Sequence, residues 1–113
     1  WFGFVEDADE AQLSIDLACW FTGTAAAAAA AEDGEESPPP NDFHIRNDND
    51  LLRTVAVDPA SDVTWLPNPG SPDSEGIGYA AWVDGRQARS FMPGVWLRVE
   101  DGRIIEIDEQ YTP

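Results

Sequence analysis

Lysine is absent from this sequence of 113 residues, and all six basic residues are arginine. They stand against 22 acidic residues, so the formal net charge is −16 at pH 7. A surface this negative repels nucleic-acid phosphates and anionic lipid headgroups. The composition therefore argues against a nucleic-acid partner and favours cations, basic partners or a high-salt habitat. A simpler explanation is solubility, or the codon bias of a GC-rich genome that avoids lysine.

Cysteine, histidine and long apolar runs are also scarce. Cys19 is the only cysteine, so no intrachain disulfide can form, and its apolar neighbours predict a buried, inert thiol. His44 is the only histidine, and no G-x-S-x-G, CxxC or HExxH motif occurs. The sequence therefore predicts a protein that is not an enzyme.

No run is long enough to cross a bilayer, so direct membrane insertion is not expected. The chain opens on Trp1, inside a predicted strand, without a Met or a signal peptide. This start is typical of a processed protein or of a fragment of a longer one.

Length and pattern predict a single β-rich domain over residues 1–113, with loop or linker insertions at 34–42 and 67–78. Apolar residues that alternate with polar ones, such as Leu13, Ile15 and Leu17, indicate half-buried strands. Strands are expected at Trp1–Asp7, Gln12–Ala18, Asn41–Asn47, Leu52–Val57 and Asp62–Leu66. The last is either a separate strand or a continuation of the one before it after a turn at Pro59.

Two segments have helical character. Thr22–Asp33 contains seven consecutive alanines, which have the best helix propensity, and Gly34 stands where a C′ glycine belongs. Gly78–Arg86 is expected to form one or two helical turns, with Tyr79, Trp82 and Val83 on one side. Residues 86–93, which include Arg89, read as a polar connection.

The C-terminal residues predict a hairpin, in which Val95, Leu97 and Val99 face Ile105 and Ile107. A three-residue loop at 100–102 pairs Leu97 with Ile105 and Val95 with Ile107, which places all five apolar residues on one face. Gly102 is then left-handed at a bulge. Trp96 falls on the opposite face, together with Arg98, and is the best candidate among the tryptophans for an exposed side chain. Most of the other tryptophans are expected to belong to the core.

These elements predict an α+β fold. We expect a mostly antiparallel curved sheet or a small β-barrel, OB-like among the possibilities, with one Ala-rich helix.

The stretch Asn41–Thr54 combines a short alternating strand with a dense run of Asn and Asp. Phe43 and Ile45 are expected to be buried, with His44 and Arg46 on the outer face. Calcium takes roughly six to eight oxygen ligands, and the candidate ligands here are Asp42, Asn47, Asp48 and Asp50. The spacing lacks the Gly and Glu of an EF-hand loop. The alternative is that these residues form turns and cap the backbone, with no cofactor bound.

Arginine is scarce, and its fork-shaped side chain binds two carboxylate oxygens at once. A polar network is therefore expected between two arginines, Asp42 and the C-terminal residues; its members are Arg46, Arg53, Asp42, Glu109, Gln110 and Tyr111. The network acts as a structural clamp or, alternatively, as a ligand pocket. The candidate ligand or partner residues are His44, Arg46, Arg53 and Trp96.

Several short motifs resemble those of small secreted domains from Gram-positive, often actinobacterial, exported proteins and lipoproteins. The motifs are Asn41-Asp42-Phe43, Ile45-Arg46-Asn47, Asn49, Leu52-Arg53-Thr54, Gly3-Phe4-Val5 and Glu109-Gln110-Tyr111. The resemblance covers nearly the whole chain, although Asp50 stands where proline is common. It implies an extracellular or cell-envelope location and no catalytic residues.

We therefore expect a non-enzymatic, exported interaction or structural module of the cell envelope, which binds a protein partner or assembles with itself. The alternative is a calcium- or small-ligand-binding module built on Asn41–Asp50.

Overall fold

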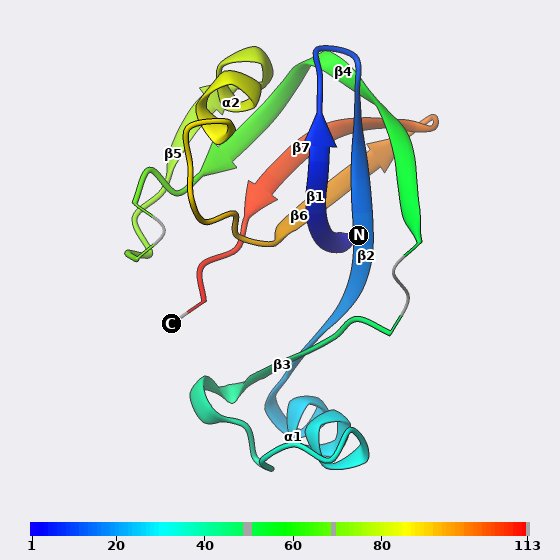
Figure 1. Ribbon diagram of the computed structural model, residues 1–113, viewed down its shortest axis with the longest axis vertical. Helices are drawn as coiled ribbons and strands as arrows, with labels where there is room; N and C mark the ends of the chain where they lie inside the picture. The colour runs from blue at the N-terminus through cyan, green and yellow to red at the C-terminus, as the bar shows by residue number, and fades with distance from the viewer. Residues whose placement is uncertain (49–50, 69, 113) are drawn as a thin grey trace.

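The computed structural model describes residues 1–48, 51–68 and 70–112, which form seven strands, two α-helices and one 3-10 turn (Figure 1). In chain order the elements are β1 (Phe2–Ala8), β2 (Gln12–Thr22), α1 (Gly23–Glu32), η1 (Pro40–Asp42), β3 (Phe43–Arg46), β4 (Leu52–Trp65), β5 (Glu75–Gly78), α2 (Tyr79–Arg86), β6 (Val95–Glu100) and β7 (Arg103–Glu109).

Strands β1, β2, β4, β7 and β6 close into a small barrel. Each pairs with the next in that order, and β6 returns to β1 where Phe2 lies opposite Trp96 and Gly3 opposite Val95. The β4–β7 pairing is parallel and the other four are antiparallel. Strands β3 and β5 lie outside the barrel, paired with the far ends of β2 and β4. The predicted α+β fold with a small β-barrel is thus confirmed.

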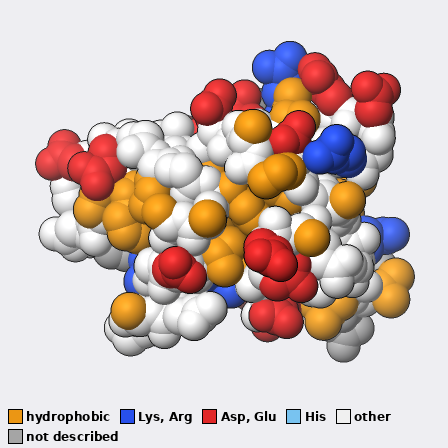
Figure 2. Space-filling view, turned by 90° about the horizontal axis from the view of Figure 1, so that it is seen from above, with side chains coloured by type: hydrophobic (Ala, Val, Ile, Leu, Met, Phe, Trp, Pro, Cys, Tyr) orange, Lys and Arg blue, Asp and Glu red, His pale blue; other side chains and the backbone are white. Residues whose placement is uncertain are grey.

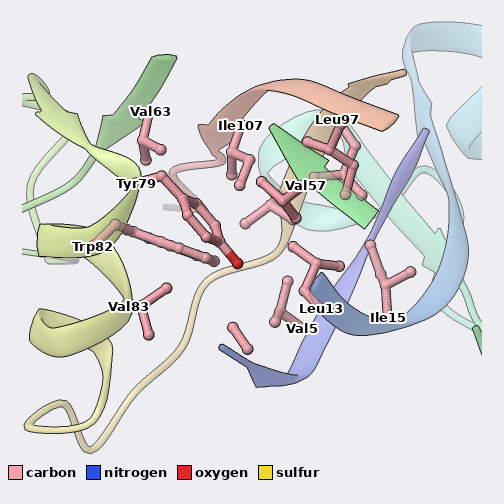
Figure 3. Close-up of a cluster of buried hydrophobic side chains, with 13 residues drawn as sticks. Val5, Leu13, Ile15, Val57, Val63, Tyr79, Trp82, Val83, Leu97 and Ile107 are labelled. Carbon is pink, nitrogen blue, oxygen red and sulfur yellow. The ribbon is translucent and has the colours of Figure 1, made fainter. Parts of the chain in front are cut away.

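The barrel interior is filled by alternate residues of its strands (Figure 3). Its most deeply buried aliphatic side chains are Leu13, Ile15, Val63, Val95, Ile104 and Ile107. Helix α2 adds Tyr79, Trp82 and Val83, which lie on its buried side as their helical spacing predicts. Each such side chain contributes about 1.5–3 kcal/mol through the hydrophobic effect. The core therefore holds α2 against the strands.

Strand β4 passes through Pro59 without ending. The parallel register with β7 shifts between Val57 and Asp62, where Asp58 accepts a hydrogen bond from the Ala60 N–H at 2.9 Å. The buried Ser61 hydroxyl lies 2.6 Å from the Asp58 carbonyl and 2.9 Å from the Ile104 carbonyl. It therefore connects the irregular part of β4 to β7. Of the two alternatives, continuation of one strand is therefore correct.

The segment expected to be a loop at 67–78 ends in a strand. Strand β5 pairs with β4, with Ile77 opposite Val63 and Glu75 opposite Trp65. The sequence pattern did not predict this strand, because two of its four residues, Gly76 and Gly78, are glycines, and glycine is a poor strand former.

The C-terminal hairpin corrects the predicted register. Its loop has two residues, Asp101 and Gly102, with φ of 53° and 75°, which matches a type I′ turn. The bulge lies instead in β7, because Ile105 has no partner between the pairs Val99–Ile104 and Arg98–Glu106. Leu97 therefore lies opposite Ile107 rather than Ile105. The extra residue restores the apolar face that a continuous two-residue hairpin would have mixed, and positive φ at Gly102 is confirmed.

Beyond the barrel, the last residues of β2 carry α1 and β3 at one end of the molecule (Figure 1). The buried face of α1 consists of Ala26, Ala29 and Ala30, whose small side chains let the helix lie close to the β2–β3 ribbon. The helix ends in a Schellman motif, with Gly34 at φ 74° and the Glu35 N–H donating to the Ala30 carbonyl at 2.9 Å. Gly34 is therefore the C′ residue that the sequence predicts.

Candidate functional site

The side chains of His44 and Arg46 project from β3 onto the C-terminal end of α1. Asp33 Oδ2 lies 2.7 Å from His44 Nε2 and accepts a hydrogen bond from Arg46 Nε at 3.1 Å. Arg46 Nη2 also reaches Asp33 Oδ1 at 3.0 Å and Glu32 Oε2 at 3.0 Å. The hydrogen bonds from Arg46, followed by that from His44, lower the pKa of Asp33 below its ordinary value of 3.8. We call Asp33, His44 and Arg46 the α1 clasp.

The α1 clasp contradicts the predicted one-sided burial of β3. Phe43, His44, Ile45 and Arg46 are all half-buried, and only 12% of the His44 side chain is exposed. The face expected to meet solvent is covered by α1, which the alternation of one strand cannot reveal. His44 and Arg46 therefore hold the helix in place.

The predicted network between the central stretch and the C-terminus is wrong. Arg46 binds α1, and Arg53 is exposed on β4, opposite Ile15, and takes part in none of the ion pairs found among the described residues. Gln110 accepts a hydrogen bond from Trp96 Nε1 at 2.9 Å. The two ends of the expected network thus serve separate parts of the fold.

The partner of Glu109 is Arg89, from the segment expected to be a polar connection. Glu109 has no exposed side-chain surface; it accepts hydrogen bonds from the Leu66 N–H at 2.8 Å and from Trp82 Nε1 at 3.0 Å, as well as from Arg89. The Arg89 guanidinium lies 5.1 Å from the Trp65 ring centroid and donates to the Leu66 carbonyl. The pair joins the end of β7 to α2 and the end of β4.

The candidate calcium ligands that the structure describes lie at the two ends of β3, Asp42 before it and Asn47 and Asp48 after it. Asn41 and Asp42 adopt positive φ just before β3, as Asn and Asp tolerate at strand ends, and Asn47 Nδ2 donates to Asp16 Oδ2 at 2.8 Å. Asp50 lies outside the described residues. Among those described, no three His, Cys, Asp or Glu side chains are grouped as a metal site requires. Calcium binding by Asp42, Asn47, Asp48 and Asp50 stays a prediction, testable by melting with and without the ion.

The predicted burial of Cys19 is wrong, since the thiol is exposed on β2 opposite Arg46. The expectation that most tryptophans belong to the core is also wrong. Only Trp82 is fully buried, whereas Trp1 is 55% exposed and Trp96 is 37% exposed. Exposure of Trp96 is as predicted.

Four aromatic side chains form a continuous band on the outside of the barrel and its extension, which we call the aromatic strip: Trp96, Phe2, Trp20 and Phe43. Ring centroids are 5.0 Å apart between Trp96 and Phe2, 5.3 Å between Phe2 and Trp20, and 4.8 Å between Trp20 and Phe43. The strip therefore crosses β6, β1, β2 and β3 without interruption.

Strand alternation places the aromatic strip outside the barrel. The neighbours Gly3 and Val95 lie opposite each other and Val95 is buried in the core, so Phe2 and Trp96 point to the other side. Phe2 is only 4% exposed because the other rings and Gly94 enclose it. A Cβ at Gly94 would lie 2.5 Å from Phe2 Cζ, so the strip has a tightly fitted base.

One signal for the aromatic strip was present in the sequence, namely the alternation that places Trp96 outward. The other contacts depend on two tertiary facts that a local pattern does not contain. Strand β6 pairs with β1 at barrel closure, and β2 continues past Ala18 to pair with β3. Trp20 therefore lies on β2, beyond the predicted end of that strand at Ala18.

Comparison with protein-family models, with curated proteins and with solved structures finds no match for this chain. None of the helices in the described part of the chain has the length and apolar character needed to span a membrane.

Proposed function

We propose that this chain is a non-enzymatic interaction module that acts in the cell envelope after export. The observation that carries the proposal is the aromatic strip, which ends in the exposed Trp96. Aromatic side chains that are rigidly supported and open to water are typical anchors of binding surfaces. Export rests on the resemblance of the Asn41–Thr54 motifs to those of small secreted domains.

We also infer that the barrel is of the OB type. Support comes from the order β1-β2-β4-β7-β6, the parallel pairing of its third and fifth strands, and the helix α2 between its third and fourth strands. OB barrels bind oligonucleotides on the face of their second and third strands, here β2 and β4.

The outward residues of that face disfavour a nucleic-acid ligand. On β2 they are Gln12, Ser14 and Asp16, and on β4 they are Leu52, Thr54 and Ala56. Ser14 and Thr54 hydroxyls are 3.4 Å apart across the two strands. The set contains no base-stacking ring and no arginine, which nucleic-acid binding requires. The module is therefore proposed to bind through the aromatic strip instead.

The test uses the full-length protein in the cells that naturally make it. A photo-crosslinking amino acid replaces Trp96 in one variant and Asp73, an exposed residue before β5, in a control. We expect the protein to be labelled by an impermeant reagent on intact cells, and an identified protein adduct to form from position 96 and not from position 73. Confinement to the cytoplasm would contradict export, and equal or absent adducts at both positions would contradict the interaction surface.

A further inference from the structure

The exposed end of the aromatic strip carries a carboxylate beside the indole. Asp108 on β7 lies opposite Trp96 in the β6–β7 register, and both point outward because Ile107 and Glu109 point into the core. Trp96 is held from below by Phe2 and from the side by its hydrogen bond to Gln110. Trp96 and Asp108 are therefore cross-strand neighbours on the outer face of the barrel, where Asp108 is half-buried.

Asp108 takes part in none of the ion pairs found among residues 1–48, 51–68 and 70–112. The arginine nearest along the strand, Arg98, is directed elsewhere. Its Nη2 bonds Glu100 at 3.2 Å and its Nη1 lies 3.8 Å from Glu106. Asp108 thus keeps its charge available for a cation that the described chain does not supply.

At two other places in this chain, an aromatic ring and a carboxylate together bind one arginine side chain. The Arg89 guanidinium lies over Trp65 while it bonds Glu109, and the Arg46 guanidinium lies 5.3 Å from the Phe21 centroid while it bonds Asp33. In both cases the planar cation stacks on an aromatic face and its fork grips the acid. Trp96 and Asp108 present the same two groups with the position of the guanidinium open.

The net charge of the chain distinguishes between the classes of ligand that could bind the aromatic strip. A second copy of the chain would bring −16 against −16, and anionic polymers or membranes meet the same repulsion. Figure 2 shows acidic side chains spread between apolar ones over one face of the molecule. A positively charged ligand is the one that this negative electrostatic potential attracts.

The geometry of the strip also disfavours a neutral glycan. A sugar chain stacks best on aromatic faces that are coplanar, because its rings form a flat ribbon. Here Trp96 is tilted by 48° against Phe2, and Phe2 by 60° against Trp20. A single planar group fits Trp96 better than a ribbon fits the strip.

We propose that Trp96 and Asp108 form a docking site for an arginine side chain in a cationic segment of a partner protein. The guanidinium stacks on the outer side of the indole and donates two hydrogen bonds to Asp108. Lysine is the weaker ligand, because its ammonium is a point charge without a planar fork. This inference rests on the proposed interaction function and names the chemistry of its partner.

The test titrates the chain with end-blocked decapeptides of alternating Arg and Gly, Lys and Gly, or Glu and Gly. Nuclear magnetic resonance follows the indole N–H signal of Trp96, which is assigned from its loss in Trp96→Phe. We expect the Arg peptide to shift this signal, the Lys peptide to bind several-fold more weakly, and the Glu peptide not to bind. Asp108→Asn and Trp96→Ala should each weaken binding of the Arg peptide about tenfold, since each removes one half of the site. The affinity of every variant is measured by isothermal titration calorimetry, because Trp96→Ala lacks the signal that the resonance titration follows.

Matched controls separate the site from the overall charge. Asp73→Asn removes one exposed carboxylate outside the strip, and Trp1→Ala removes an exposed indole that is not one of its rings. Both should leave the affinity within about twofold, and circular dichroism checks that every variant is folded. Equal weakening by Asp73→Asn and Asp108→Asn would overturn the proposal, because only diffuse attraction would then be at work.

Two further outcomes would also overturn it: a cellohexaose-induced shift of the Trp96 signal without a shift by the Arg peptide, or concentration-dependent dimers that protect Trp96. An identified adduct at position 96 in cells, together with no response to the Arg peptide, would reject the ligand class and leave the interaction function standing. Absence of both would reject the two proposals together.

Discussion

The guanidinium of Arg89 and the carboxylate of Glu109 form a buried ion pair, with side-chain exposed fractions of 10% and 0%. Glu109 also accepts hydrogen bonds from the Leu66 N–H and from Trp82 Nε1. The carboxylate therefore meets donors from the end of β4, from α2 and from the segment that follows α2. Among the described residues, none of the exposed ion pairs connects as many elements.

Arg89→Ala should lower the free energy of unfolding by about 3–5 kcal/mol, because it leaves the Glu109 charge buried without its partner. Arg98→Ala is the matched control, since the Arg98 side chain is 64% exposed and pairs only with surface carboxylates. It should cost no more than about 1 kcal/mol. Urea unfolding at pH 7 measures both. Similar losses in the two variants would show that the buried pair has no special weight.

The α1 clasp should make stability depend on pH in the acid range. Because the pKa of Asp33 is lower in the folded chain than its ordinary 3.8, its contribution is fully present above 3.8 and is lost as the pH falls further. Asp33→Asn should therefore be less stable than the wild type at pH 7, and the difference should shrink below pH 3.8. Asp73→Asn, in an exposed loop, serves as the control. A difference that stays constant across this range would contradict the clasp.

Tyr79 should remain un-ionised to unusually high pH. Burial, reinforced by the charge of Asp9, raises its pKa from 10.0 to about 12. A raised pKa stabilises the fold below pH 10, and this stability is lost as the pH rises towards about 12. Tyr79→Phe should therefore lose less stability than the wild type between these two values. Ultraviolet absorbance of the phenolate, with Tyr111→Phe to isolate the Tyr79 signal, checks the titration directly. Ionisation of Tyr79 near pH 10 would refute the expectation.

The type I′ turn makes Gly102 sensitive to substitution by any side chain. At φ 75° an alanine is strained, so Gly102→Ala should cost on the order of 1–3 kcal/mol. Gly76→Ala is matched to it, because a Cβ at either position meets open space and only Gly102 has positive φ. The control should be neutral or slightly stabilising. Thermal melting compares the two, and an equal effect would argue that the turn is not left-handed.

Local patterns were enough for parts of the fold that depend on neighbouring residues. Spacing placed Tyr79, Trp82 and Val83 on the buried side of α2, and Gly34 at the end of α1, since both features follow from helical geometry. Alternation placed Trp96 outward. Register was harder, because the bulge at Ile105 leaves the apolar pattern of β7 readable in two ways.

By itself the sequence determined the charge of the surface, the approximate positions of most strands and the α+β class with a curved sheet or small barrel, because these depend on composition and on periods of two or 3.6 residues. Tertiary structure alone decided what each side chain meets. The sequence pattern placed Arg89 in a polar connection, but in the fold β7 brings Glu109 into contact with it. The pattern placed His44 on the outer face of its strand, but α1 covers that face. The aromatic strip arises only when barrel closure pairs β6 with β1 and the long β2 carries Trp20 to Phe43. These contacts join residues far apart in the chain, and no local period encodes which distant strand becomes the neighbour.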